Sequence, residues 1–368
     1  GKTITLSAAN PRFALPFRAF ASPSAPPKSE SQYLPATYKA NANFKANADI
    51  KAVTPPVVQP GYLIKAPEPD GILTYQGKSF RGSLLIKARP AENPGFLVIN
   101  KVDLEDYLLS VVPSEMPASW NLESLKAQSI AARSYALANL NKHGSEGYDL
   151  KATTEDQVYL GIQTETENSN RAVAETEGVV LKHDGKIVSA FFHSSGGGFT
   201  ELAEHVWTKG VPYLKSVPDF DDHSPHFAWN KQVPVSNMEE TLRKQGKDVG
   251  AILGIFALAR TPSQRVQTAM IAGTLQTLIV SGEELRKIMQ VPSTVFNIGQ
   301  AADAYLVAGR GFGHGLGMSQ WGAKYLSEQG YNAAQILSYY YKDVTIQPYQ
   351  FGPDRSNLSR AAHASPVY

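Results

Sequence analysis

Apolar and polar positions alternate with helical spacing most clearly over residues 104–112. The apolar members recur at i, i+3, i+4, i+7 and i+8, which is the spacing of one buried helix face: Leu104, Tyr107, Leu108, Val111 and Val112. Asp103 is suited to cap this helix, and Pro113 is expected to end it. A second helix is predicted over 121–143, closed by Gly144, with small residues that allow a neighbour to pack closely: Ala131, Ala132 and Ala136.

Short apolar runs separated by Gly, Pro and Asn predict strands and turns ahead of these helices: 71–75, 83–87 and 96–102. Asp184-Gly185, between the runs 178–183 and 186–192, predicts a β-hairpin. Further helices are predicted at 170–177, 237–244 and 281–289. Two more are predicted after the glycine-rich segment, one ending at about 329 and one at 332–341 with Asn332 and Gln335 as a capping pair. This mixture predicts an α+β fold of small mixed sheets packed with helices.

The distribution of proline and charge divides the chain. Residues 1–60 hold nine of the 24 prolines, and residues 1–65 hold eight Lys and Arg but two acids. We expect 1–60 to be a basic arm, disordered or extended, because it is too poor in core-forming residues to offset its ordering entropy. Structure is expected to begin near Gly61. A domain is predicted over 61–350, with an inserted α+β subdomain at 230–300 and a tail at 351–368.

Composition excludes several classes of protein. The chain has no cysteine, which excludes disulfides and thiolate metal sites. The net charge of +2 gives no reason to expect a nucleic-acid partner. The basic arm could contact anionic wall polymers or lipid, and it could equally be a solvated leader that binds nothing. No apolar stretch is long enough to span a membrane. The chain begins at Gly1 without a signal-type apolar segment, so we expect any export signal to lie upstream.

Glu115 is the first candidate for chemistry. It lies between two prolines, Pro113 and Pro117, in what the sequence predicts to be a stiff turn joining two helices. Apolar neighbours such as Met116 and Trp120 would raise the pKa of this carboxyl, as the general acid of a glycosidase requires. The local pattern by itself favours the alternative, in which Glu115 caps the next helix or faces water, because a loop glutamate is usually solvated.

Two glycine-rich segments are the other candidates. His193, Ser194 and Ser195 precede Gly196-Gly197-Gly198, where small residues would let a ligand approach the backbone N–H groups; a tight structural loop explains this segment equally well. Ser195 lacks the frame of a nucleophile elbow. Glycine then recurs at every second position from 309 to 317, around His314, a pattern that fits neither type of nucleotide-binding loop.

Other motifs are weaker. Phe312 and Trp321 could stack on a sugar ring, and His314 is as compatible with a structural role as with ligand binding. His223 and His226 are spaced i, i+3, but Ser224-Pro225 between them predicts a turn instead of a helical metal-ligand pair. No metal site and no cofactor are therefore expected.

The ordered set of segments resembles the SpoIID/LytB family. The matching segments run from about residue 61 to 349 in the family's order, and each is short: 81–84, 102–108, 111–117, 125–136, 156–159, 193–201 and 311–323. The resemblance implies a catalytic lobe whose single catalytic residue is the Glu of the P-S-E-M-P block, Glu115. It also implies a set of positions near the family's cleft that we expect to bind substrate: Lys126, Arg133, Gln157, Tyr159, His193, Ser194, Ser195, His314, Gln320 and Trp321.

The activity that the resemblance implies is that of a lytic transglycosylase, which cleaves MurNAc–GlcNAc strands of peptidoglycan stripped of stem peptides and leaves 1,6-anhydroMurNAc ends. Such an enzyme would work outside the cytoplasm, in the periplasm or cell wall. The alternative is a non-catalytic protein that enhances a partner cell-wall amidase or binds glycan, because some members of the family are described in that way. Members that bind zinc use a His and a Cys near the glycine loop; this chain has His193 but no Cys. A peptide amidase would need a metal cluster that the sequence does not offer.

Overall fold

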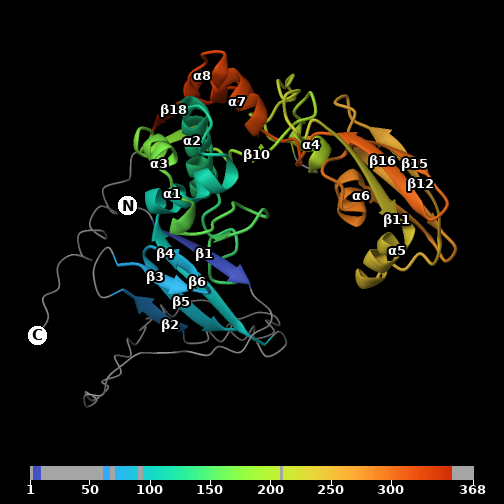
Figure 1. Ribbon diagram of the computed structural model, residues 1–368, viewed down its shortest axis with the longest axis horizontal. Coiled ribbons are helices and arrows are strands. Elements are labelled where there is room, and N and C mark those ends of the chain that lie inside the picture. The colour runs from blue at the N-terminus through green and yellow to red at the C-terminus, as the bar shows by residue number, and fades with distance from the viewer. Residues whose placement is uncertain (1–2, 10–60, 67–70, 90–93, 208–209, 350–368) are drawn as a thin grey trace, which may run out of the picture.

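The computed structural model describes residues 3–9, 61–66, 71–89, 94–207 and 210–349, and for 3–9 it describes the backbone. Figure 1 shows two lobes, joined through the segment around β10 (Phe192–His193) and α4 (Ala203–Val206). Helices and small, mostly antiparallel sheets are combined in one chain, so the predicted α+β fold is confirmed. None of the helices in these residues has the length and apolarity that crossing a membrane would require.

The first lobe contains a five-stranded sheet with the order β2-β5-β6-β1-β7. Its strands are β1 (Thr3–Ala9), β2 (Gly61–Lys65), β5 (Ser83–Ala88), β6 (Phe96–Asp103) and β7 (Leu150–Lys151), beside the short hairpin β3 (Leu73–Tyr75) and β4 (Lys78–Phe80). The expectation that structure begins near Gly61 was wrong, because β1 pairs antiparallel with β6, Thr3 opposite Asp103. The arm over 10–60 and the tail over 351–368 lie outside the described residues, and the domain limits stay a prediction.

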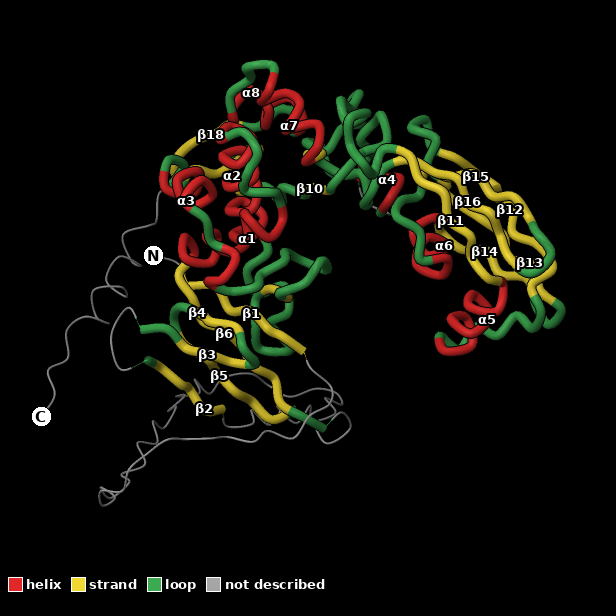
Figure 2. The backbone as a smooth tube through the Cα atoms, viewed as in Figure 1, coloured by secondary structure: helices red, strands yellow, loops and turns green. Residues whose placement is uncertain are grey.

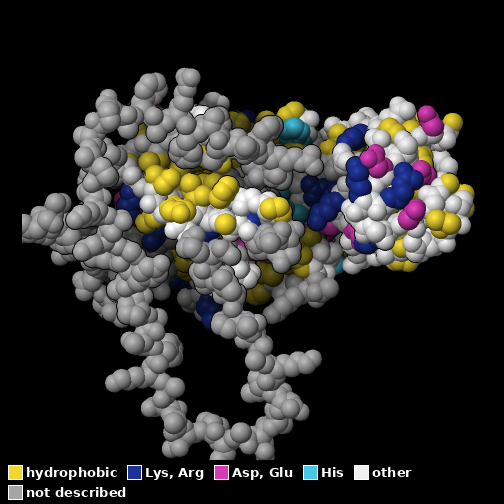
Figure 3. Space-filling view, turned by 90° about the horizontal axis from the view of Figure 1, so that it is seen from below, with side chains coloured by type: hydrophobic (Ala, Val, Ile, Leu, Met, Phe, Trp, Pro, Cys, Tyr) yellow, Lys and Arg dark blue, Asp and Glu magenta, His cyan; other side chains and the backbone are white. Residues whose placement is uncertain are grey.

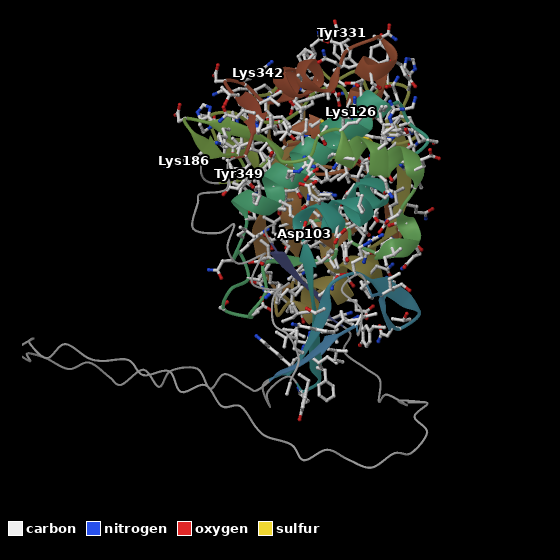
Figure 4. All side chains as sticks on the ribbon, turned by 90° about the vertical axis from the view of Figure 1, so that its left-hand side faces the viewer. Asp103, Lys126, Lys186, Tyr331, Lys342 and Tyr349 are labelled. Carbon is white, nitrogen blue, oxygen red and sulfur yellow. The ribbon has the colours of Figure 1, made fainter. Side chains whose placement is uncertain are left out.

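The helices of this lobe pack around α2 (Leu122–Ala138). Its neighbours are α1 (Leu104–Glu115), α3 (Glu167–Ala174), α7 (Gln320–Glu328) and α8 (Ala333–Tyr340), with a 3₁₀ turn at Ile162–Thr164. Thirteen residues of α2 are buried, which is why small and apolar side chains occupy nearly every side of it. The predicted capping pair of Asn332 and Gln335 at α8 is confirmed. In Figure 4, Asp103 lies where the sheet passes into the helices and Lys126 lies among the upper helices.

Two helix ends differ from those the sequence predicted. Helix α1 continues through Pro113 to Glu115. A proline this close to the C-terminal end removes only one helical hydrogen bond, and Met116 N–H still donates to Val112 O at 3.0 Å, so the last turn forms. Glu115 is therefore the last residue of α1 and not part of a turn between prolines. Helix α2 ends at Ala138 instead of His143, because Asn139 caps it and hydrogen-bonds both Tyr135 O and Ser189 Oγ.

The predicted hairpin is confirmed, with β8 (Val179–His183) and β9 (Lys186–Ile187) joined at Asp184-Gly185, both of which have positive φ. Strand β18 (Thr345–Pro348) pairs with β8 on its other side. Strand β10 is separate from this sheet and pairs in parallel with β17 (Met318–Ser319), so that His193 lies opposite Ser319. This pairing brings two segments more than 100 residues apart in sequence to one place.

The second lobe consists of two three-stranded sheets and two helices (Figure 2). One sheet has the order β11 (Ala228–Pro234), β16 (Ala304–Arg310), β15 (Val295–Gln300), and the other has β12 (Ile252–Arg260), β13 (Val266–Gly273), β14 (Thr277–Ser281). The helices α5 (Val235–Lys244) and α6 (Gly282–Met289) overlap the predicted ones. This lobe has its own hydrophobic core. Figure 3 shows hydrophobic side chains gathered on the first lobe, whereas Lys, Arg, Asp and Glu are spread over the second.

Candidate functional site

The carboxyl of Glu115 is mostly buried where α1 ends. Its Oε1 accepts a hydrogen bond from Val158 N–H at 2.7 Å, and the side-chain amide of Gln320 donates to it as well. Burial raises the pKa of Glu115 to about 7, against the two hydrogen bonds, which lower it. The site therefore holds a carboxyl that is close to half-protonated at neutral pH, and no basic side chain among the described residues is hydrogen-bonded to it.

Helix α7 delivers Gln320 to this carboxyl. Ser319 caps the helix by accepting a hydrogen bond from Gly322 N–H at 3.2 Å, so Gln320 is its first residue and is almost fully buried. Trp321 N–H donates to Ser194 O at 3.1 Å, which fixes the loop after β10 against the start of the helix. Three sequence-predicted residues, Glu115, Ser194 and Gln320, are thus placed together by the first turn of α7.

Aromatic side chains lie beside this point. The rings of Trp120 and Trp321 meet edge-to-face with their centroids 4.8 Å apart, and both are half-buried. Lys324 Nζ lies 5.5 Å from the Trp321 ring and 5.9 Å from the Trp120 ring. Trp120 follows Glu115 by five residues and Trp321 follows Gln320 directly. The half-buried indole pair and Lys324 therefore belong to the same helix ends that carry Glu115 and Gln320, and partly exposed indole surface is suited to sugars.

The two predicted histidines lie against each other, with ring centroids 5.7 Å apart. His193 donates from Nδ1 to Leu316 O at 3.1 Å, and no described residue hydrogen-bonds its buried Nε2. His314 accepts Leu316 N–H at Nδ1, 2.9 Å away, and hydrogen-bonds the Phe192 backbone through its other nitrogen. Burial lowers the pKa of His193 well below its ordinary value and that of His314 to about 3, with a further contribution from the nearby arginines. Both rings are therefore neutral at pH 7.

The loop over 195–198 is bound to two aspartates that the sequence analysis did not single out. Asp221 accepts hydrogen bonds from Ser195 Oγ, Gly197 N–H and Gly198 N–H, and Asp219 accepts one from Gly196 N–H. Burial and the charge of Asp221 raise the pKa of Asp219 to about 6. The backbone N–H groups that were expected to meet a ligand are thus used within the protein, and Ser195 has a structural hydrogen bond.

Four other predicted residues are held in contacts within the protein. Arg133 is fully buried and pairs with Glu105 through two hydrogen bonds of 2.8 and 2.7 Å. Lys126 pairs with Glu123 and Glu175 at 2.8 and 2.7 Å. Gln157 and Tyr159 are buried on either side of Val158, where Gln157 accepts from Tyr107 OH at 2.9 Å and Tyr159 OH donates to Asn100 at 2.8 Å.

These contacts give the four residues different relations to the carboxyl. Gln157 and Tyr159 anchor the strand-like segment whose Val158 N–H binds Glu115, so they position the site. The contacts of Lys126 and Arg133 run to α1, α3 and the β8 segment, on the helices that carry the site. Their predicted role in substrate binding stays a prediction. Among the described residues, no group of three or more His, Asp or Glu side chains is arranged to hold a metal ion.

Comparison with known proteins places these features in a family. The family model described as stage II sporulation protein (SpoIID) matches residues 92–183, which include Glu115 and Val158. A second model, described as a domain of unknown function (DUF8618), matches residues 154–317, which run from this segment through the second lobe to the glycine-rich loop.

Curated relatives extend this similarity over most of the chain. Stage II sporulation protein D of Bacillus subtilis (strain 168) is 33% identical over 289 residues, covering 72% of this chain and 82% of the relative. The amidase enhancer of the same organism is 32% identical over 293 residues, covering 66% of this chain and 40% of the relative. An uncharacterized protein of Brachyspira hyodysenteriae is 29% identical over 290 residues, covering 76% of this chain and 77% of the relative.

Proposed function

The chain belongs to the stage II sporulation protein D (SpoIID) family, and from that premise we propose that it is a lytic transglycosylase of peptidoglycan whose single acid–base group is Glu115. The observation that supports this most is the carboxyl at the end of α1, whose pKa burial raises to about 7. A group of that pKa can both donate and accept a proton at neutral pH.

The proposed reaction needs no second carboxylate. Protonated Glu115 donates its proton to the glycosidic oxygen as the bond from C1 of MurNAc to that oxygen breaks, and the GlcNAc of the next unit leaves with a free hydroxyl. The 6-hydroxyl of the same MurNAc attacks C1, and the Glu115 carboxylate takes its proton. The product carries a 1,6-anhydro ring, and Glu115 is protonated again at the end of the cycle. A hydrolase that activates water would need two carboxyl groups instead.

The surroundings of Glu115 suit these two steps. The Val158 N–H and the Gln320 amide stabilise the carboxylate that Glu115 forms after the first proton transfer and keeps until the second. Burial stabilises the neutral carboxyl before the reaction. The indole rings of Trp120 and Trp321 offer apolar faces for pyranose rings. The proposed substrate class is therefore a glycan strand of peptidoglycan. Because peptidoglycan lies outside the cytoplasm, the protein would act in the periplasm or cell wall.

A second candidate function is that of a non-catalytic partner of a cell-wall amidase. The observation that favours it is the 32% identity to a protein named amidase enhancer. In that case the Glu115 site would bind glycan without cleaving it, and the protein would change the activity of the amidase on the same wall.

The two functions are separated by the products formed from peptide-free glycan strands. We expect the wild-type protein to release 1,6-anhydroMurNAc ends, detected by mass analysis. Glu115→Gln should lower that rate by at least about 10⁴-fold, because one group serves both proton transfers. The control is Glu167→Gln, an exposed glutamate on α3, which should cleave at the wild-type rate. Unchanged glycan length with wild-type protein, together with faster peptide release when an amidase is added, would support the second function instead.

A further inference from the structure

A cavity of about 360 Å³ lies on the second lobe, and none of the residues that line it belongs to the Glu115 site. It is formed by the sheet β11-β16-β15 together with the end of β12. Its size falls at the lower end of the range for sites that hold small ligands. The functional proposal makes no use of it.

The sheet supplies a floor of small side chains and a polar border. Ala228 pairs with Arg310, while Asn230, Ala308 and Asn297 form a row across the three strands, so the side chains of these residues share one face. All five are exposed. The apolar residues between them, such as Val307, turn to the other face and into the lobe's core. This gives an open polar hollow, where two amide groups can bind hydroxyl and acetamido groups.

The charge of the cavity has one sign. Two arginines and no acidic residue line it. The guanidinium of Arg260 is fixed by Phe296 O at 2.8 Å, Gln264 O at 2.9 Å and Asn297 Oδ1 at 3.1 Å. The guanidinium of Arg310 makes no hydrogen bond or ion pair with any residue that the structure describes. A free arginine beside a fixed one is suited to binding a carboxylate through two parallel hydrogen bonds.

The cavity is connected to the glycine-rich loop of the first site. Arg310 is followed directly by Gly311, whose carbonyl accepts a hydrogen bond from Trp229 Nε1 at 2.9 Å. A Cβ at Gly309 would lie 2.2 Å from the Trp229 ring, so glycine is needed for the indole to pack over the strand. The wall of the cavity therefore continues into the chain segment that carries His314 and, further on, Gln320.

We propose that this cavity binds an N-acetylated sugar with a free carboxylate, the lactyl carboxylate of a muramic acid residue in a peptide-free strand. The inference rests on the proposed glycan substrate and specifies which form of it is recognised. Where a stem peptide is attached, the lactyl group is an amide and carries no charge at that point, so Arg310 loses its ionic partner. The second lobe thus selects strands without stem peptides, at a site separate from Glu115, which cleaves them.

Binding is tested in the Glu115→Gln background, so that the ligand is not cleaved. The probe is a tetrasaccharide of alternating GlcNAc and MurNAc with free lactyl carboxylates, compared with the same sugar after conversion of each carboxylate to its methylamide. Calorimetry gives the affinity, and backbone amide shifts of Arg310 and Val158 report the cavity and the Glu115 site separately. We expect the free acid to shift the Arg310 amide and to bind there about tenfold more tightly than the methylamide.

Arg310→Gln should remove this preference for the free acid, while the control Arg243→Gln, an exposed arginine on α5 of the same lobe, should keep it. Melting temperatures confirm that both variants are folded. Equal affinity for acid and methylamide, or an Arg310 amide that does not shift, would overturn the proposal. Displacement of the sugar by an equal concentration of inorganic phosphate at constant ionic strength would also overturn it, in favour of a general anion site.

The outcome is independent of catalysis. Cavity binding with no release of anhydro ends from wild-type protein would contradict the proposed enzyme and leave the cavity assignment in place. Release of anhydro ends with no shift at Arg310 would contradict the cavity assignment and leave the proposed enzyme in place.

Discussion

At the scale of single residues, the ionisation of Glu115 connects stability with function. Its folded-state pKa of about 7 lies above the ordinary value of 4.5. Below about pH 4.5 both the folded and the unfolded protein carry the proton, so burial of this group has little cost. As the pH rises to 7, the unfolded chain releases the proton first, and the free energy of unfolding falls. The loss attributable to this one carboxyl is roughly 3 kcal/mol.

Glu115→Gln should therefore stabilise the protein in alkaline solution and leave it almost unchanged in acid. The amide keeps the size of the carboxyl but has no charge to bury. We expect a gain in the free energy of unfolding of up to about 3 kcal/mol at pH 8 and of under about 1 kcal/mol at pH 4. Denaturant titrations of both proteins at the two pH values measure this. A variant that is less stable than the wild type at pH 8 would show that Glu115 has a capping or structural role.

Gln320→Ala tests how the neighbouring helix adjusts the same carboxyl. The amide hydrogen bond lowers the pKa of Glu115, so its removal should raise that pKa further. Because the reaction begins with the protonated acid, the alkaline limb of the kcat/KM profile should move to higher pH. The exposed Gln329→Ala, at the other end of α7, is the matched control. A limb that stays in place while the rate falls would indicate that Gln320 acts only through folding.

The residues of the site differ in how far the sequence predicts them. Glu115, Gln320 and Trp321 lie in short motifs, and the structure brings all three to one place. Val158 contributes a backbone N–H, to which its side chain gives no clue. Asp219 and Asp221 bind the loop over 195–198 from more than 20 residues away, and only the fold creates that proximity. Arg133 and Lys126 have the chemistry of ligand-binding residues, but Glu105, Glu123 and Glu175 lie within reach and form ion pairs with them.

At the scale of elements, local patterns predicted those helices and turns whose signals are local. The stripe beginning at Leu104, the Asp184-Gly185 turn and the Asn332 cap each depend on neighbours within a few residues. Strand β1 could not be found in this way, because its partners β6 and β7 are about 95 and 140 residues further along the chain. Pro113 was taken as a helix end, yet near a C-terminus the helix loses only one hydrogen bond to it.

Removing residues 1–9 should destabilise the first lobe. Strand β1 is the only described partner of β7 and separates it from β6, so the deletion leaves an open edge on β6 and no strand partner for β7. We expect the melting temperature to fall by at least about 5 °C. Removal of residues 1–2 alone is the control and should change it little. An unchanged melting temperature in the longer deletion would show that β1 contributes nothing to the stability of the sheet.

At the scale of the whole molecule, the second lobe contacts the first through a few buried polar groups. Glu201 of the first lobe accepts hydrogen bonds from Thr261 Oγ1 at 2.6 Å and from Ser263 Oγ. Arg265 of the second lobe is fully buried and donates to Gly196 O at 2.7 Å. Its guanidinium lies over Gly315, where a Cβ would be 2.4 Å from Nη2, so a side chain at that position would have to displace the guanidinium.

These contacts predict that Arg265 links the second lobe to the glycine-rich loops of the first. Arg265→Met keeps most of the apolar stem but removes the charge and the hydrogen bond to Gly196 O, so the protein should lose roughly 2–4 kcal/mol of stability. The charge of Arg265 also lowers the pKa of His314, so that pKa should rise in the variant. Histidine ring shifts followed by NMR against pH measure the change. The exposed Arg243→Met is the control for the loss of one arginine from the lobe.

The combination of results separates a link between the lobes from ordinary core packing. If Arg265 only fills space, the variant should be less stable, but glycan cleavage per folded molecule should stay at the wild-type rate. If Arg265 holds the loop, glycan cleavage per folded molecule should fall, because Gly311 to Gly317 lead into the helix that carries Gln320. The rise in the pKa of His314 follows from the lost charge in either case, so it shows that the guanidinium was close to the ring, and cleavage per folded molecule decides between the two roles of Arg265.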